Sequence, residues 1–377
     1  MLCYSENREN CDTVQCSGYK MAPLEISEEA FDKCCQIEPI CEDRGTVWIG
    51  RHKPSNSRYV LKIYDLEKCG EELDRIKDEI TTVRQLQHRN VIKYLVSFIS
   101  GNHLWIVMPL IGYTSASRLI VSHFTNGLPE PALALIFKDI LCGLHYLHSK
   151  GIIHRSIKGT HILVDSEGRS LLCGFRHSTN SILQGKWEKR IHSYPPEAAY
   201  NLNWASPEML KQDMEGYSEK TDIYSLGVTL CELGNGEIPY CKYEPQLILV
   251  EKVYGRQPFL YDMHTCRFLF ENGKDSGVGG SYGDCLGSLP KAAEKAFSAS
   301  AHNFVSKCVE YDASARPSAE KLFDHPFIRQ TRKMDIKLPE MLHPVTPITD
   351  ETQLGETEVV NDVHYDSQQS PDVMWDL

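Results

Sequence analysis

The sequence lacks any apolar run of membrane-spanning length, and no basic start followed by an apolar segment marks a signal peptide. We therefore expect no membrane as a partner. Its 14 cysteines are scattered and form no repeated Cys-x-x-Cys pair, which argues against a structural zinc site and favours reduced thiols. The chain also shows no internal repeat, so a solenoid or propeller is not expected.

The sequence also has fewer basic than acidic residues. Lys and Arg number 40 against 51 Asp and Glu, a formal net charge of −11. This acidic balance argues against nucleic acid as a partner. The 377 residues are enough for two lobes with a sizeable core and additional tails.

The most ordered pattern covers residues 151–176, which read GIIHRSIKGTHILVDSEGRSLLCGFR. Two short apolar runs, 162–164 and 171–172, flank a turn at 165–168 and are typical of a small hairpin. This order of parts resembles the protein-kinase segment in which H-R-D-L-x-x-x-N is followed by two strands and then D-F-G.

Three chemically active positions of the kinase pattern differ here. The catalytic-base position holds Ser156, the metal-binding asparagine position holds His161, and D-F-G has become Gly174-Phe175-Arg176. Serine is no base at neutral pH, histidine is a poor ligand for magnesium, and glycine offers no ligand. We therefore expect a pseudokinase without phosphoryl transfer and without a bound metal. An active kinase with relocated residues is the alternative.

The N-terminal half resembles the strand-rich lobe of a kinase. Residues 47–49 and 59–63 are typical of strands, and residues 38–47 occupy the place of the glycine-rich phosphate loop. That loop reads EPICEDRGTV and keeps only Gly45, so the nucleotide clamp is expected to be weakened or absent.

Lys62 ends a run that resembles the kinase V-A-I-K strand, and Glu79 lies on the polar side of a helical pattern over 72–86. We expect the two to pair, the alternative being that both are simply solvated. An atypical serine/threonine kinase would have to work through this pair. The residues that match kinase positions around ATP form a candidate nucleotide site: Val47, Val60, Lys62, Glu79, Met108, Lys158, Leu163 and Arg176.

ATP, if bound, would not require magnesium. Lys158 and Arg176 could supply to the phosphates the positive charge that magnesium normally provides. The other interpretation of Arg176, weighed equally, is that it pairs with a neighbouring acid.

The helical half keeps the structural parts of a kinase. Glu208 follows Ser206-Pro207 in the A-P-E position, Asp222 is the buried aspartate of a D-x-W-S-L-G-like helix, and Arg316 belongs to a D-P-x-x-R-P-like segment. In the kinase fold Glu208 and Arg316 form a buried ion pair. His154 and Phe175 are likewise expected to be structural.

These patterns predict an α+β, bilobal, protein-kinase-like fold with a small β-rich N-lobe and a larger α-helical C-lobe. The expected boundaries are a disordered leader at 1–34, the N-lobe at 35–110 and the C-lobe at 111–328. A flexible insertion is expected at about 256–293, and a disordered acidic tail with a docking motif at 329–377.

Two regions are candidates for protein contacts. His192 and Tyr194 lie in the segment that active kinases present to substrates, although aromatic residues there can instead pack inside the C-lobe. The acidic tail ends in Trp375-Asp376-Leu377, which is suited to docking an apolar tip into a pocket.

A narrower resemblance rests on HRSIKGTHIL, G-F-R in place of D-F-G, the W-x-SPE ending, DIYSLG, the HPVTPIT linker and the terminal Trp-acid-apolar tripeptide. Together these motifs resemble the sterile-20-related adaptor (STRAD) pseudokinases. The resemblance implies an inactive adaptor that binds and activates an LKB-type serine/threonine kinase and retains it in the cytoplasm. It further implies a scaffold of the mouse-protein-25 (calcium-binding protein 39) class, which takes the terminal tripeptide. Shuttling to the nucleus is left open.

Overall fold

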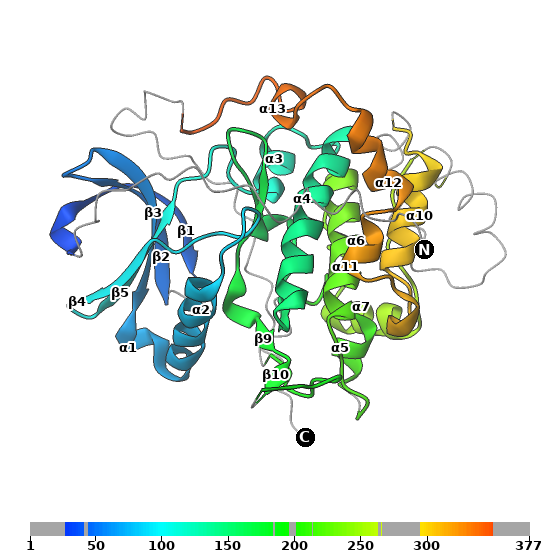
Figure 1. The fold of residues 1–377 in the computed structure, drawn as a ribbon, viewed down its shortest axis with the longest axis horizontal. Coiled ribbons are helices and arrows are strands. Elements are labelled where there is room, and N and C mark those ends of the chain that lie inside the picture. The colour runs from blue at the N-terminus through cyan, green and yellow to red at the C-terminus, as the bar shows by residue number, and fades with distance from the viewer. Residues whose placement is uncertain are drawn as a thin grey trace, which may run out of the picture.

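The structure is a computed structural model of the 377-residue chain, and it describes residues 27–40, 44–183, 185–195, 201–212, 214–262, 265 and 295–349. Two lobes of different composition lie side by side, a sheet-rich lobe at the N-terminal side and a helical lobe after it (Figure 1). The predicted α+β bilobal kinase-like fold is confirmed.

The N-lobe is built on one antiparallel sheet of five strands in the order β1-β2-β3-β5-β4. The strands are β1 (Phe31–Ile40), β2 (Gly45–His52), β3 (Ser57–Asp65), β4 (Val96–Ser100) and β5 (His103–Pro109). Side chains alternate between the two faces, so Leu61 and Val107 enter one cluster with Trp105 while Tyr64 and Ile106 enter the main core.

Helix α2 (Leu73–Gln85) belongs to the N-lobe and directly follows two short helical segments, α1 (Leu66–Cys69) and η2 (Gly70–Glu72). A third short turn, η1 (Glu28–Ala30), precedes strand β1. The apolar residues of α2 recur with helical spacing, which buries Ile76 and Val83 on one side. Glu79 is buried on this helix as well, so an acidic group is carried into the space between the lobes.

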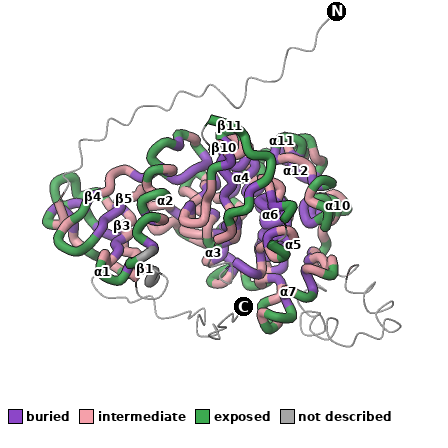
Figure 2. The backbone as a smooth tube through the Cα atoms, turned by 90° about the horizontal axis from the view of Figure 1, so that it is seen from below, coloured by how far each residue is buried: buried purple, intermediate pink, exposed green. Residues whose placement is uncertain are grey.

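The C-lobe surrounds two long helices, α4 (Glu130–Ser149) and α6 (Lys220–Asn235). Figure 2 shows both as largely buried segments inside an exposed outer layer. The other C-lobe helices are α3 (Ala116–Ser122), α5 (Pro207–Lys211), α7 (Pro245–Val253), α10 (Ala299–Cys308), α11 (Ala319–Leu322), α12 (Pro326–Arg329) and α13 (Leu338–Met341).

In the described part of the C-lobe, two small hairpins, one further pair of short strands and four 3₁₀ turns complete the structure. The strand pairs are β6 (Ile152–Ile153) with β9 (Thr179–Asn180), β7 (Ile162–Val164) with β8 (Ser170–Leu172), and β10 (Ile182–Leu183) with β11 (Lys186–Trp187). The turns are η3 (Gly159–His161), η4 (Phe175–His177), η6 (Ala313–Ala315) and η7 (Gln330–Lys333). The expected hairpin at 162–172 is therefore present.

Two predicted boundaries are wrong. The leader was placed at 1–34, but strand β1 begins at Phe31, whose ring is buried against Tyr59 and Phe98. The tail was placed from residue 329, but the chain stays folded to Thr349, with Leu338 and Leu342 buried in the main core. Single apolar residues that are separated by prolines give no helical or strand periodicity, so the sequence pattern did not predict this packing.

Residues 256–262 of the predicted insertion form no helix or strand, but Leu260 is buried in the core, so this part is packed against the C-lobe. The rest of the insertion, apart from residue 265, lies outside the described residues, as do 1–26 and 350–377. Across the ranges that the structure describes, no helix is long and apolar enough to cross a membrane.

Candidate functional site

The predicted pair of Lys62 and Glu79 joins strand β3 to helix α2. Lys62 on β3 donates its Nζ to both Glu79 carboxylate oxygens, at 3.0 and 3.3 Å, and the Tyr94 hydroxyl donates to the same group. Burial opposes charge on Glu79, but Lys62 and Tyr94 outweigh it, so the pKa of Glu79 lies below its ordinary value. The pairing is confirmed, and it is the arrangement in which active kinases hold these two residues.

The catalytic-base position contains a hydrogen-bonded serine. The Oγ of Ser156 lies 3.1 Å from Nδ1 of His161 and accepts a bond of 3.0 Å from the Asn201 amide. The same Nδ1 lies 2.7 Å from the Ser156 carbonyl oxygen and donates to it, since a carbonyl can only accept. Burial and the nearby Lys158 hold the pKa of His161 well below its ordinary value, so its ring is neutral.

The two metal-ligand positions face each other across a filled space. Gly174 has a φ of +82°, and a Cβ on it would lie 2.5 Å from Cγ of His161. The imidazole therefore occupies the volume that an aspartate side chain at 174 would need. Within the described parts of the chain, no group of three or more His, Cys, Asp or Glu side chains is placed to hold a metal ion.

Phe175 keeps its expected structural position. Its buried ring lies 4.7 Å from the ring of His154, and the turn η4 that carries it packs against helix α2. Burial lowers the pKa of His154 to about 4, so the neutral imidazole can donate through Nε2 to the Cys173 carbonyl oxygen at 3.0 Å. This stack joins the N-lobe helix to the catalytic-loop equivalent.

Arg176 forms an ion pair with an acid of the N-lobe. Its guanidinium donates to Glu72, at the start of α2, and only 9% of its side chain is exposed. Arg75 and Arg44 also contact this carboxylate, at 2.6 and 3.6 Å. Of the two interpretations of Arg176, the pairing with a neighbouring acid is the one observed. Glu72 was missed, because nothing in its sequence context distinguishes it from the other acids of 71–79.

The remaining candidate ATP residues fall on both sides of the cleft. Val60 is paired with Met108 across β3 and β5, Val47 is paired with Lys62 across β2 and β3, and Leu163 lies on β7. All four apolar side chains are partly buried. The Lys158 ammonium lies 5.4 Å from the centroid of the Trp204 ring, near the end of the activation-segment equivalent.

The predicted structural residues are where the kinase pattern requires them. Asp222 accepts bonds of 2.8 Å from the backbone N–H groups of His154 and Arg155, and its carboxylate also lies 2.9 Å from His148 Nε2. Arg316 pairs with Glu208 through two bonds of 2.6 and 2.9 Å. The role of His148 was not foreseen, because it depends on a residue 74 positions away.

The two candidate contact residues of the activation segment differ in burial. His192 is exposed, but the Tyr194 ring lies 5.4 Å from the Tyr217 ring and packs on a small cluster that includes Met209. Trp204 is buried, and its indole N–H donates to Glu232 at 2.8 Å. His192 therefore stays a candidate contact residue, whereas Tyr194 packs at least partly within the C-lobe, which is the alternative expected for aromatic residues there. Trp375, Asp376 and Leu377 lie outside the described residues.

A sheet-rich lobe, a helical lobe and these site residues define the class of protein. Residues 43–328 match the family model described as "Protein kinase domain", so the chain has a kinase fold. It is 36% identical to the STE20-related kinase adapter protein alpha of Mus musculus, over 82% of this chain and 75% of the relative. The identity to the alpha protein of Gallus gallus is 37%, over 82% and 83%, and that to the beta protein of Homo sapiens is 32%, over 76% and 72%.

This chain belongs to the STE20-related kinase adapter family. The family resemblance inferred from the motifs is confirmed. The relatives are named as adapters of kinases, and an adaptor role is thereby supported for a kinase fold whose base and metal-ligand positions hold Ser156, His161 and Gly174.

Proposed function

We propose that the chain is a catalytically inactive adaptor that binds an LKB-type serine/threonine kinase, activates it allosterically and retains it in the cytoplasm. A scaffold of the mouse-protein-25 class completes the complex and takes Trp375, Asp376 and Leu377. The adapter names of the relatives and their similarity over most of the chain support the adaptor part of this proposal.

The observation that carries the proposal is that one kinase feature is intact while a neighbouring one is replaced. The pair of Lys62 and Glu79, which marks the active arrangement of a kinase, is intact at 3.0 Å. Beside it, the imidazole of His161 fills the space next to Gly174 where a metal-binding carboxylate would stand. A protein that keeps the active shape without the means of chemistry is suited to hold a partner kinase in its active shape.

ATP without magnesium remains part of the proposal. The aliphatic side chains of Val47, Val60, Met108 and Leu163 provide a surface for an adenine ring, and Lys62 provides a fixed cation. Arg176 could reach a phosphate only by leaving Glu72, so any contribution from it would cost that ion pair.

A weakly active kinase is the second candidate function, favoured only by the intact pair of Lys62 and Glu79. Metal dependence separates the two. An enzyme needs magnesium to transfer phosphate, whereas an adaptor should activate its partner kinase without any transfer of its own.

The test uses the full chain with the purified partner kinase and scaffold. The His192→Ala variant should weaken copurification of the kinase about tenfold, the range of an interface residue that contributes above 1 kcal/mol. His192 is exposed and donates no described side-chain hydrogen bond, so the melting temperature of the His192→Ala variant should equal that of the wild type.

Tyr194→Ala is the matched control for folding effects. Its ring packs on the C-lobe, so this variant should lower the melting temperature as well as binding. Undiminished binding of the kinase by His192→Ala would reject this surface. No activation of the kinase by the wild-type chain would reject the adaptor function itself.

A further inference from the structure

The hairpin of β10 and β11 carries an exposed basic surface around an aromatic ring. The indole of Trp187 is 58% exposed, and Lys186, Lys189 and Arg190 beside it are exposed as well. In the described part of the chain, no carboxylate lies within ion-pair distance of these three cations. With Glu188 as the only acid among them, residues 186–190 carry a net charge of +2.

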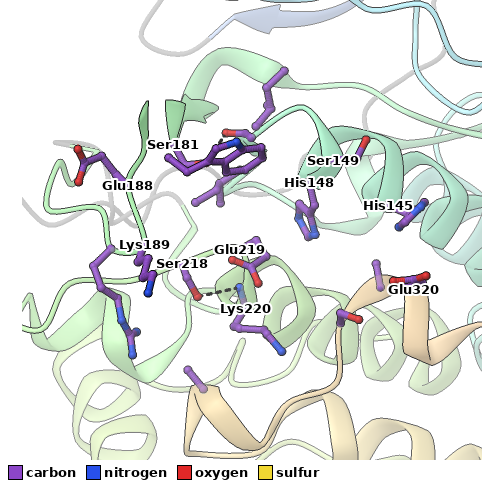
Figure 3. A pocket seen from close by; sticks show the side chains of 18 of the residues that line it. His145, His148, Ser149, Ser181, Glu188, Lys189, Ser218, Glu219, Lys220 and Glu320 are labelled. Carbon is purple, nitrogen blue, oxygen red and sulfur yellow. Dashed lines mark hydrogen bonds between the residues drawn. The ribbon is translucent and has the colours of Figure 1, made fainter. Parts of the chain in front are cut away.

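A hollow of about 520 Å³ opens beside this hairpin. Figure 3 shows side chains of the hairpin on one side of the hollow and side chains of α4, of the start of α6 and of α11 on the others. The charged residues that line it are Glu188, Lys189, Arg190, Glu219, Lys220 and Glu320. Glu188 lines the hollow together with Lys189 and Arg190, so the hairpin contributes two cations and one acid to its wall.

The chain itself contains a segment of complementary chemistry. Residues 350–377 have eight Asp and Glu and no Lys or Arg, a formal charge of −8, whereas residues 1–349 carry only −3 of the total −11. The same segment has apolar side chains at Val373, Met374, Trp375 and Leu377. We infer that residues 350–377 dock in cis on the basic hairpin, with their carboxylates on Lys186, Lys189 and Arg190 and an apolar side chain in the hollow beside Trp187.

The docking segment is long enough to reach this surface. The last described residues lie at the hinge, where the Ile348 N–H donates to the Gly112 carbonyl oxygen, and Figure 1 places α13 and β10 at opposite ends of the lobe. The 28 residues from 350 to 377 span at most about 90 Å when extended, against a radius of gyration of about 19 Å for a 300-residue domain.

Tethering is what favours this occupant over an acidic segment of another protein. A segment attached to the same chain has an effective concentration set by the length of its linker, which favours even a weak contact between opposite charges over the same contact with a separate protein. Exposed ion pairs are individually weak and screened by salt, and the contact is therefore reversible. A docked tail would compete with the scaffold for Trp375, which gives the adaptor a way to withhold its docking motif until a scaffold is present.

Zero-length carbodiimide cross-linking of the full chain tests this inference, because it joins a lysine amine only to a carboxylate in direct contact. Mass spectrometry of the monomer band should find Lys189 linked to acids between 350 and 376. In the variant Lys186→Glu/Arg190→Glu, which keeps Lys189 as the reporter, the yield should fall roughly tenfold, and 0.5 M salt should lower it similarly.

The matched control reverses two other exposed cations, Arg332 and Lys333, which border neither this hollow nor the smaller one beside Tyr311. The variant Arg332→Glu/Lys333→Glu should keep the wild-type yield at Lys189. Links confined to a dimer band would show a second copy as the occupant and overturn docking in cis. Links no more frequent at Lys189 than at Lys333 would overturn this location. The chain is tested alone, so the result does not depend on the proposed partner kinase or scaffold.

Discussion

His161 and Gly174 show how two substitutions can depend on each other. A Cβ at position 174 would lie 2.5 Å from the His161 ring, and the φ of +82° already disfavours a side chain there. An aspartate restored at position 174 alone should therefore not fit beside the His161 ring, whatever its capacity to bind a metal ion.

We predict that Gly174→Asp lowers the free energy of unfolding by about 1–3 kcal/mol, as overpacking does. The double variant Gly174→Asp/His161→Asn should recover much of this loss, because asparagine is smaller than the imidazole. Urea unfolding measures both. A single variant as stable as the wild type would show that the ring moves aside freely. Neither variant should transfer phosphate while Ser156 remains at the base position.

Buried histidines make stability depend on pH. Burial lowers the pKa of His154 to about 4, and burial together with Arg176 does the same for His177. Free histidine titrates near 6.5, so between about pH 4 and 6.5 the unfolded chain binds more protons than the folded one. Stability should therefore fall as the pH drops from 6.5, by up to about 1.4 kcal/mol per pH unit for each histidine.

His177→Asn tests this linkage. The slope of unfolding free energy against pH, measured by urea unfolding from pH 5.0 to 6.5, should be shallower than in the wild type by about one proton. Above pH 7.5 the two proteins should have equal slopes, because the histidine is then neutral in both the folded and the unfolded chain. Equal slopes from 5.0 to 6.5 would show that the pKa of His177 is the same in the folded and the unfolded chain.

At the scale of elements, the segment after α12 belongs to the C-lobe. Leu338 and Leu342 are buried, and α13 packs against α4. Gly168 allows a close approach here, since a Cβ on it would lie 2.5 Å from Cδ of Pro339. The segment therefore connects the turn between β7 and β8 with the hinge at Gly112.

Leu342→Ala should lower the free energy of unfolding by about 2–5 kcal/mol, because the side chain is fully buried. Ile336→Ala is the matched control in the same segment. Its side chain is 54% exposed, so the change should stay within about 0.5 kcal/mol. Chemical denaturation compares the two. If both variants cost equally little, the segment would not be packed in solution as the structure shows.

The whole molecule joins its two lobes through contacts that need no metal ion. Arg176 pairs with Glu72 at the start of α2, and the turn η4, which contains Phe175 and Arg176, packs against the same helix. These contacts hold the N-lobe helix against the turn that stands in the place of D-F-G. Magnesium normally adds to this closure in an active kinase.

ATP should accordingly raise the melting temperature by the same amount in EDTA as in magnesium, because no described carboxylate is placed beside Gly174 to hold the ion. Thermal denaturation at millimolar ATP measures this. The variant Lys62→Met should lose the shift, since it removes the fixed cation of the cleft. A shift seen only with magnesium would contradict the absence of a metal requirement, and no shift at all would remove ATP from the proposed function.

The sequence alone determined the kinase frame and the residue types that stand at its base and metal-ligand positions. Those features reside in residue types at fixed spacing, such as Ser156 in the base position and Asp222 in its helix, and each type fixes what a side chain can donate, accept or bind. The pair of Lys62 and Glu79 could also be predicted, because a strand and the following helix carry the two residues in a recurring order.

Tertiary structure alone decided which neighbours meet. The choice of Glu72 for Arg176, the packing of Tyr194 on Tyr217, the role of His148 and the packing of Leu342 all depend on residues far apart in the chain. A pattern of local spacing records the chemical type of each group and the face of the element on which it lies. It does not record which distant group occupies the adjoining volume, and at Gly174 that volume is filled by the ring of His161.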